Sequence, residues 1–163
     1  MILVDEAPSQ PHPKLPNARR RSYRHRMSDP TWTGGCLCGA VRYVARGEPR
    51  FMGYCFCTDC RKASGSGFIP FIDVASDAVK ITGTVITHTL KHEDGREAVR
   101  NACAVCGGLV YGGEVGNPRG HTIYAGSLDD PSLFKPSIAI FTRDKPDWVV
   151  VPPGLALFES MPS

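Results

Sequence analysis

The sequence lacks any long hydrophobic run. None of its apolar segments approaches the roughly 18 residues that a membrane-spanning helix needs. The apolar stretch Met1–Val4 is also far too short for the hydrophobic region of a signal peptide. We therefore expect a protein without a membrane-embedded part, located in the reducing environment of the cytoplasm.

The chain also lacks sustained helical periodicity and internal repeats. No segment repeats apolar residues with a period of 3.6 over the roughly eleven residues that identify an amphipathic helix, and no repeat occurs at the periods of solenoid proteins. From Trp32 onward the sequence instead shows short runs typical of β-strands, separated by glycine-rich turns. These features predict a mainly β fold with strands at 40–45, 51–56, 68–74, 79–82, 85–90, 98–101, 109–111, 122–125, 138–141 and 148–151, one helical turn at 58–63 and a hairpin loop at 92–97.

Net charge is missing from most of the chain. The overall charge of +3 is carried by residues 1–29, which contain six Lys or Arg and three Asp or Glu, while the rest holds 13 residues of each sign. The balanced part lacks the basic surface that binding to a phosphate backbone requires. We therefore do not expect this part of the chain to bind nucleic acid.

Residues 1–29 have the composition of a disordered basic, proline-rich leader. Four prolines between positions 8 and 16 break any helix, and almost nothing apolar follows Val4. The arginine-rich run 19–26 is either a solvated tail or a patch for nucleic acid or targeting, and translation could also begin at Met27. We expect residues 30–163 to form one domain with its own core.

Isolated cysteines are absent, because all seven lie in three short clusters. An odd number of thiols cannot pair completely in disulfides within one chain, and cysteines one residue apart are poorly placed to bridge each other. A redox C-x-x-C motif would require a βαβ context that the sequence does not show. Spacings of one and two residues instead let thiolates converge on one ion at about 2.3 Å, which favours metal binding. The clusters are Cys36 with Cys38, Cys55 with Cys57 and Cys60, and Cys103 with Cys106.

Seven thiols divide naturally into four and three. Four thiolates close a tetrahedral zinc site, whereas three leave one coordination position for water or substrate. The first and last clusters lie in glycine-rich turns and would together clamp the 64 residues between them, so that metal binding would contribute to folding. The alternatives are one four-ligand site with three spare thiols, one cluster with bridging thiolates, and an iron–sulfur cluster, which suits these spacings less well.

Charged residues beside the three-cysteine cluster are candidates to stabilise its thiolates. Arg61 and Lys62 directly follow Cys60 and are either such cations or ordinary solvent-facing residues. Asp59 is a candidate proton carrier or a cap of the short helix. Three histidines lack ligand spacing to any cysteine pair, and we expect them to be surface or packed side chains: His88, His92 and His121.

Five segments give the chain a resemblance to a known family. They are TGGCLCGAVRY at 33–43, CFCTDCRK at 55–62, CAVCGG at 103–108, AGSLDDP at 125–131 and KPDW at 145–148. In these segments the chain resembles the glutathione-dependent formaldehyde-activating enzyme family, which includes the domain of centromere protein V. The resemblance covers nearly all of residues 31–160.

The resemblance implies a mainly β, tent-like fold similar to that of the Mss4-like proteins, with small antiparallel sheets clamped by zinc. It implies a structural zinc on Cys36, Cys38, Cys103 and Cys106 and a second zinc on Cys55, Cys57 and Cys60. The implied reaction is the reversible joining of glutathione and formaldehyde to S-hydroxymethylglutathione, a carbon–sulfur lyase activity.

The chain departs from the family at three places. Phe56 and Ala139 stand where the family often has histidine, and Ala102 stands where an aromatic residue is common. These departures bear on the substrate rather than on metal binding.

Two functions follow as hypotheses. The first is a zinc-dependent enzyme that holds a thiol as thiolate, the nucleophilic form, and adds it to a small aldehyde or reverses that addition. The second is a non-catalytic, zinc-stabilised binding module.

Overall fold

β-Strands form most of the regular structure in the computed structural model, which describes residues 30–93, 95–113 and 120–162. The predicted leader, residues 1–29, lies outside this part of the chain. The strands are β1 (Thr31–Gly35), β2 (Arg42–Arg46), β3 (Phe51–Cys55), β4 (Ile69–Val74), β5 (Val79–Thr82), β6 (Val85–Lys91), β7 (Glu97–Cys103), β8 (Leu109–Gly112), β9 (His121–Tyr124), β10 (Ile138–Ile140) and β11 (Ala156–Leu157). One α-helix, α1 (Thr58–Ser64), and the 3₁₀ turns η1 (Ser76–Ala78), η2 (Ala125–Ser127), η3 (Pro131–Leu133) and η4 (Thr142–Asp144) complete the described elements. The mainly β prediction is confirmed.

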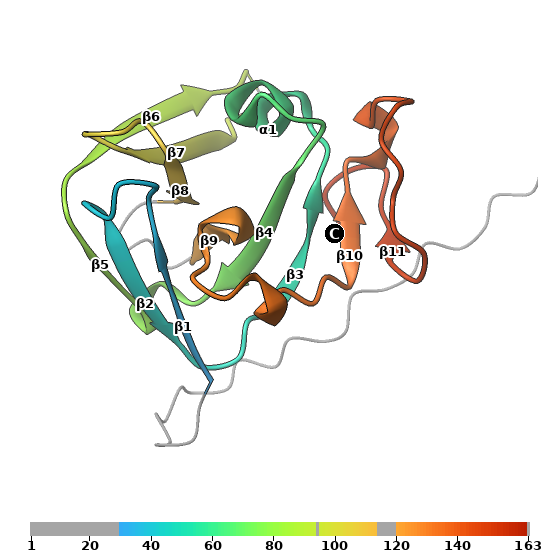
Figure 1. The fold of residues 1–163 in the computed structure, drawn as a ribbon. Coiled ribbons are helices and arrows are strands. Elements are labelled where there is room, and N and C mark those ends of the chain that lie inside the picture. Colours follow the sequence, from blue (N-terminus) through green and yellow to red (C-terminus); the bar gives the residue numbers. More distant parts are fainter. Residues whose placement is uncertain (1–29, 94, 114–119, 163) are drawn as a thin grey trace, which may run out of the picture.

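The strands form two sheets that face each other across the main core (Figure 1). The smaller sheet is antiparallel in the order β1-β2-β5, and the larger has the order β11-β10-β3-β4-β9-β8-β7-β6. The larger sheet is mixed, since β10 runs parallel to both β3 and β11. The expectation of small antiparallel sheets therefore holds for the first sheet but not for the second.

Alternation along β2 and β4 explains how the sheets meet. In β2, Tyr43 is buried and the preceding Arg42 is exposed, as expected for a strand with one buried face. In β4, Ile72 and Val74 belong to the core shared with the small sheet, together with Tyr43. Phe71 points to the opposite face of the large sheet and joins a second core cluster. The large sheet therefore covers apolar side chains on both of its faces.

Most predicted strands are present, but three terminal segments differ. Residues 148–151 form no strand, and Trp148 and Val150 are largely exposed. The last strand of the chain is instead β11, which pairs with β10 and which the sequence did not predict. The sequence also did not predict β1, where Gly34 lies so close to Tyr43 that a side chain would not fit.

Pro70 was expected at an edge or a bulge of its strand. β4 is an interior strand, but its pairing with β9 begins only at Phe71. Pro70 therefore has a paired neighbour only on the β3 side, opposite Tyr54, where its missing N–H is tolerated.

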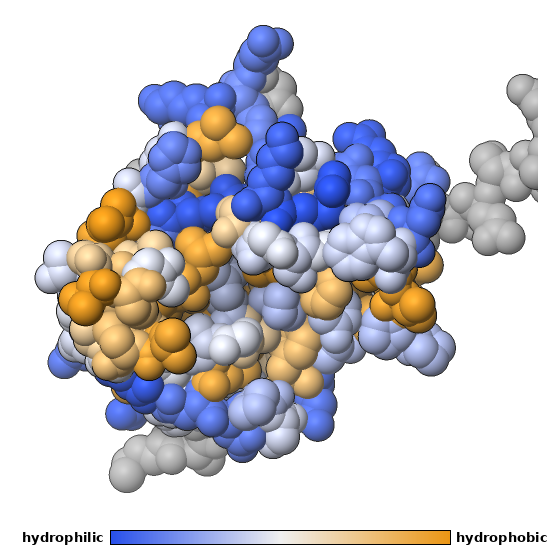
Figure 2. Space-filling model, turned by 45° about the horizontal axis from the view of Figure 1, so that its top comes forward, coloured by the Kyte–Doolittle hydropathy of each residue, from blue (hydrophilic) through white to orange (hydrophobic). Residues whose placement is uncertain are grey.

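The surface carries separate hydrophobic areas. Figure 2 shows hydrophobic residues gathered on the side where Figure 1 places the small sheet and β6–β8. Exposed apolar side chains in these segments include Leu37, Ile86 and Val105. Within the described residues, no helix combines the length and apolar character required to cross a membrane.

Candidate metal centres and the adjoining cavity

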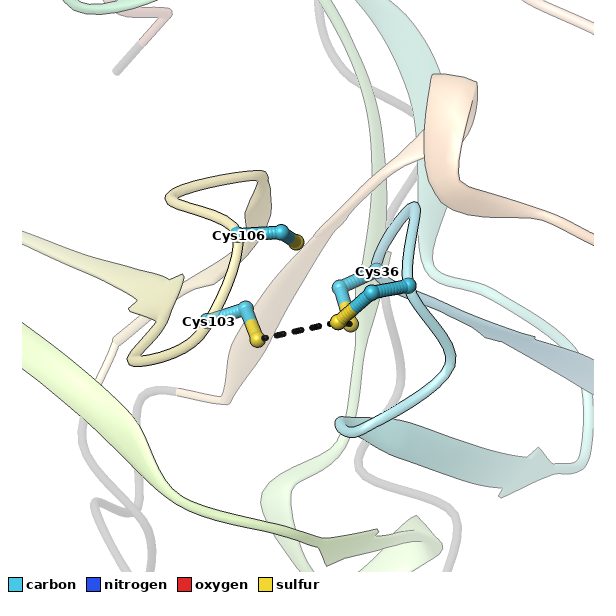
Figure 3. A group of neighbouring side chains, drawn as sticks. Cys36, Cys103 and Cys106 are labelled. Carbon is cyan, nitrogen blue, oxygen red and sulfur yellow. Dashed lines mark hydrogen bonds between the residues drawn. The ribbon is translucent and has the colours of Figure 1, made fainter.

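Four cysteines from the two sheets meet at one point. Cys36 and Cys38 lie in the loop after β1, Cys103 ends β7, and Cys106 lies in the turn before β8. Figure 3 shows the Cys103 and Cys106 side chains on one turn, facing the loop that carries Cys36. The sulfur atoms of Cys36 and Cys38 are 3.6 Å apart, and those of Cys38 and Cys103 are 3.8 Å apart. Four sulfurs at about 2.3 Å from one tetrahedral ion would lie about 3.8 Å apart, so this group fits a metal ion.

The backbone of the two loops shapes this four-thiol group. Gly39 and Gly107 adopt φ angles of 79° and 70°, and their N–H groups donate to the carbonyls of Cys36 and Cys103 at 3.1 and 2.9 Å. The N–H of Val41 donates to the Cys36 sulfur at 3.2 Å. This bond is the main reason why the pKa of Cys36 is lowered to about 6. The group therefore contains a thiol that is prepared to act as a thiolate ligand at neutral pH.

The other three cysteines form a second group around the start of α1. Cys55 ends β3, Cys57 is the N-cap of α1, and Cys60 lies in its first turn. The Cys55 and Cys57 sulfurs are 3.4 Å apart, and the N–H of Cys60 donates to the Cys57 sulfur at 3.4 Å. The hydrogen bond from Cys55 is the largest cause that lowers the pKa of Cys57 to about 2.

The two groups have the membership that the four-plus-three division predicts. Within each group the sulfur atoms lie within 4.8 Å of one another, so each can hold a metal ion. The three-thiol group supplies one ligand fewer than a closed tetrahedral site requires. Its remaining position would be available to water or to a substrate thiol.

The three-thiol group opens into a cavity on the face of the large sheet opposite the main core. The cavity has a volume of about 620 Å³, in the range of small-molecule sites. Cys55, Cys60 and Arg100 line one end, and Arg50 and Asp73 line the other. Asp73 pairs with Phe51, and Cys55 lies four residues further along β3, which corresponds to roughly 13 Å between the two ends. The walls between them are mainly apolar and include Phe51, Ile69, Phe71, Val99 and Ile140.

Among the described residues, Arg100 in β7 is the cation that forms a hydrogen bond with the three-thiol group. Its Nη2 donates to the Cys60 sulfur at 3.6 Å across 40 residues of sequence. The sequence instead suggested Arg61 and Lys62 for this role. Arg61 donates to the Phe56 carbonyl and to Thr58 Oγ1 at 3.2 and 3.3 Å, where it holds the start of α1. Lys62 is exposed.

Arg100 was missed because its partner is distant in sequence. The available signal was a charged residue inside a short predicted strand that leads directly to Cys103. One atom of its guanidinium, Nε, is buried and has no hydrogen-bond partner among the described residues.

The far end of the cavity contains an ion pair. Arg50 Nε lies 2.7 Å from Asp73 Oδ2, and Arg50 Nη2 donates to Oδ1 at 2.9 Å. Asp73 is only 9% exposed. Burial raises the pKa of Asp73 to about 6, although the Arg50 guanidinium acts in the opposite direction.

Asp59 and the histidines have structural positions. Asp59 is not the helix cap, because Cys57 occupies that place; its Oδ2 pairs with His92 Nε2 at 2.9 Å and links the β6–β7 turn to α1. His88 is exposed and His121 is buried. All three histidines are therefore surface or packed side chains, as expected.

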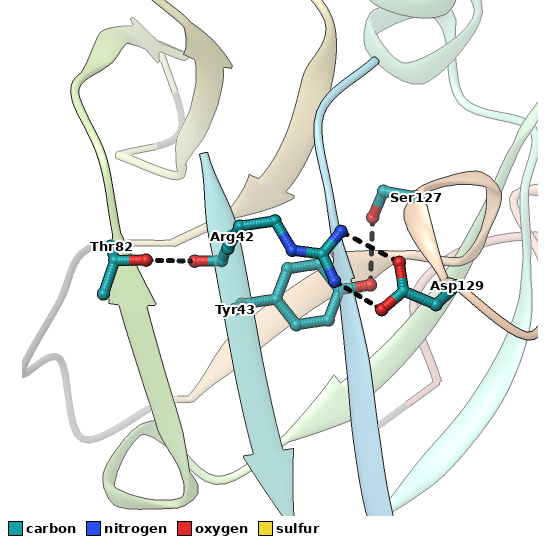
Figure 4. A network of polar contacts seen from close by, with 5 residues as sticks. All are labelled: Arg42, Tyr43, Thr82, Ser127 and Asp129. Carbon is teal, nitrogen blue, oxygen red and sulfur yellow. Dashed lines mark hydrogen bonds and ion pairs between the residues drawn. The ribbon is translucent and has the colours of Figure 1, made fainter. Parts of the chain in front are cut away.

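The 125–131 segment contacts the small sheet rather than the thiols. Figure 4 shows Arg42 of β2 paired with Asp129, and the Tyr43 hydroxyl beside Ser127. Arg42 Nη1 donates to Asp129 Oδ1 at 2.9 Å, and the Tyr43 and Ser127 oxygens are 3.1 Å apart. On the strand's other side, Thr82 Oγ1 donates to the Arg42 carbonyl at 3.4 Å. In this segment, Ser127 of η2 and Asp129, two residues further on, therefore fix the chain against β2.

Phe56 and Ala139, two of the departures from the family, lie close together next to the three-thiol group. Phe56 and Ala139 are both buried and share a small apolar cluster with Val149. The Phe56 ring also packs against Phe68 with centroids 5.6 Å apart. Both positions at which the resemblance leads one to expect histidine are therefore apolar in this chain. The third departure, Ala102, lies in β7 opposite Ile86.

This fold and these two groups define a mainly β protein with two cysteine centres that can hold metal ions. The model of the family named glutathione-dependent formaldehyde-activating enzyme matches residues 31–144, and the chain belongs to this family. A protein of Halomonas elongata named as a candidate glutathione-dependent formaldehyde-activating enzyme is 28% identical over 132 residues, which cover 72% of this chain and 79% of the relative. The crystal structure of a Rhodobacter sphaeroides protein is similar with a TM-score of 0.46 and 16% identity, over 77% of this chain and 98% of that one.

Proposed function

We propose that the protein is a zinc-dependent carbon–sulfur lyase that acts on an adduct of a thiol and a small aldehyde, such as S-hydroxymethylglutathione. The observation that carries this proposal is that the three-thiol group lies at the end of a cavity large enough for a small molecule. Family membership supports glutathione and formaldehyde as the substrates.

The two thiol groups would have different tasks. Cys36, Cys38, Cys103 and Cys106 supply four sulfurs and would hold a structural zinc, while Cys55, Cys57 and Cys60 would hold a second zinc. Zinc at the three-thiol group would supply an open position in which a substrate thiol is held as thiolate.

The residues of the chain would prepare the addition. The apolar walls around Phe71 and Ile140 would exclude water from the reacting atoms. In the forward direction the substrate thiol releases its proton to solvent, and its sulfur attacks the carbonyl carbon. A C–S bond forms, the C=O π electrons move to oxygen, and the oxygen takes up a proton. The reverse sequence releases the aldehyde.

A reducing compartment suits this chemistry. All seven cysteines are free thiols, and the proposed ligands must be thiolates. We therefore also propose a cytoplasmic location.

Metal content and activity together test the proposal. Elemental analysis of the purified protein should give two zinc ions per chain, and the loaded protein should accelerate adduct formation from glutathione and formaldehyde well above the spontaneous rate. Cys57→Ala should bind one ion and lose the acceleration, whereas Lys62→Ala, which changes a neighbouring exposed residue, should keep both.

The spectrum of the cobalt-substituted protein separates the enzyme from a binding module. An open site should change its spectrum when glutathione is added. A spectrum indifferent to thiols, with no acceleration by the zinc form, would support the non-catalytic, zinc-stabilised module instead.

A further inference from the structure

We propose that Arg100 binds the aldehyde-derived oxygen of the substrate and stabilises the negative charge that develops on it. This inference rests on the proposed function and assigns a substrate-binding role to a residue outside both thiol groups. It starts from the position of the Arg100 guanidinium between the Cys60 sulfur and the cavity.

The first argument is an unused donor. Arg100 Nε is buried without a hydrogen-bond partner among the described residues, although a buried donor of a charged group is costly to leave unpaired. Arg100 also lines the cavity. Because Nε itself is enclosed by protein atoms, a substrate oxygen in the cavity would meet the outer, Nη end of this incompletely paired guanidinium.

The second argument is distance along the substrate. In the adduct, the aldehyde-derived carbon is one bond from the substrate sulfur and the oxygen is two bonds from it. When this sulfur lies at the three-thiol group, the carbon and the oxygen therefore lie close to that group as well. Arg100 Nη2 already lies 3.6 Å from the Cys60 sulfur, so the reacting oxygen comes within reach of the same guanidinium. The cavity's other arginine, Arg50, is held by Asp73 roughly 13 Å away along β3 and is too far for this role.

The third argument is charge. Addition of the thiolate converts a neutral carbonyl oxygen into an alkoxide, and cleavage of the adduct passes through the same charge. A fixed cation in an apolar cavity stabilises this charge more strongly in the transition state than in the neutral ground state. Tyr124 also lines the cavity, but burial raises the pKa of Tyr124, so its hydroxyl remains neutral.

Arg100→Met is the principal test. We expect kcat for adduct cleavage to fall about 100- to 1,000-fold, as for the loss of one oxyanion donor. The KM for the adduct should change less than about threefold, and two metal ions per chain should remain. Arg100→Lys should recover part of kcat, and added guanidinium should partly restore the Met variant. The matched control is Lys62→Met, which removes an exposed cation close to Cys60 in sequence and should keep kcat within about threefold.

Three outcomes would overturn the assignment. A rise in KM with unchanged kcat would mean that Arg100 anchors another part of the substrate, and loss of one metal ion would mean that it only supports the thiol group. An Arg100→Met variant as active as the wild type would refute the role directly. Each differs from failure of the proposed function, in which the wild-type protein itself would not accelerate the reaction.

A binding measurement tests, without turnover, whether Arg100 binds a hydroxyl oxygen close to a bound thiol, here one bond further from the sulfur than in the adduct. The cobalt-substituted protein is titrated with 2-mercaptoethanol and with 1-propanethiol, which has the same shape but lacks the hydroxyl oxygen. The wild type should prefer mercaptoethanol, and Arg100→Met should reduce this preference about fivefold to tenfold. An equal preference in both proteins would contradict the assignment.

Discussion

Arg42 and Tyr43 are neighbours in β2, but their partners differ in exposure. The Arg42–Asp129 pair is nearly half-exposed on both sides, whereas the Tyr43 hydroxyl is buried beside Ser127. We expect Tyr43→Phe to lower the free energy of unfolding by about 1 kcal/mol, because a buried hydrogen bond is lost. Asp129→Asn should leave it almost unchanged, because water screens an exposed pair. Urea denaturation of both variants tests this, and equal losses would contradict the distinction.

Asp73 makes stability depend on pH. Its pKa in the folded state, about 6, is above its ordinary value of 3.8. The native state therefore binds more protons than the unfolded state between about pH 4 and 6, so this carboxyl favours the native state below that window and the benefit is lost as pH rises through it. Between pH 4.5 and 7, the free energy of unfolding of the wild type should fall relative to that of Asp73→Asn. Both proteins are measured at each pH, so that any effect of metal loss is common to both and cancels in the difference. A constant difference would show that Arg50 keeps Asp73 ionised throughout.

The individual thiols were predictable from the sequence, whereas their nearest cation was not. Only two residues separate Cys57 from Cys60 on one turn, so the approach of their sulfur atoms follows from local geometry. The contact between Cys60 and Arg100 depends on where β7 passes α1, which no local pattern specifies. Arg61 was the reasonable expectation, but its side chain is used to hold the turn.

At the scale of elements, α1 depends on both of its ends. The Cys57 sulfur accepts from the Cys60 N–H at the start, and Gly65 ends the helix with a φ of 63°. An added Cβ at Gly65 would meet no atom within 4 Å, so Gly65→Ala tests backbone strain alone. We expect a loss of about 1 kcal/mol, because the left-handed conformation disfavours residues with a Cβ. Gly126→Ala has equal space without a positive φ and should be nearly neutral; equal losses would exclude the backbone explanation.

The sequence predicted strands correctly where a run of strand-forming residues was several residues long. β3, β5 and β6 follow β-branched and aromatic runs and begin where the sequence predicts. β11 has only two residues, and its pairing with β10 is decided by the path of the C-terminal segment. Residues 148–151 have strand-forming composition, but they pair with none of the described strands. Val149 is instead buried in the cluster that contains Phe56.

At the scale of the molecule, the four-thiol group joins two sheets that share little backbone pairing. Cys36 and Cys38 belong to the loop after β1 in the small sheet, while Cys103 ends β7 and Cys106 lies in the β7–β8 turn of the large sheet. Among the described residues, Gly34 and Leu128 form an isolated bridge near this point, and the N–H of Asp129 donates to the Thr33 carbonyl at 3.0 Å. The mixed order of the large sheet could not be predicted, because parallel pairing of β3 with β10 joins segments more than 80 residues apart.

This arrangement predicts that loss of the metal ion from the three-thiol group leaves the protein folded, whereas loss of the ion from the four-thiol group unfolds it. A chelator should first remove the ion from the three-thiol group, which opens to the cavity, without a change in the circular dichroism spectrum. Removal of the second ion should coincide with unfolding, because metal binding at a site that joins distant segments contributes directly to the free energy of folding. Metal release and dichroism are followed together in one titration.

Matched cysteine variants separate the two groups. Cys57→Ser should bind one ion and keep a denaturation midpoint close to that of the wild type. Cys38→Ser should destabilise the fold by several kcal/mol, because an incomplete ligand set weakens the clamp between the sheets. If Cys38→Ser were as stable as Cys57→Ser, the four-thiol group would not hold the sheets together, and the packing of Tyr43, Ile72 and the other core residues would have to suffice.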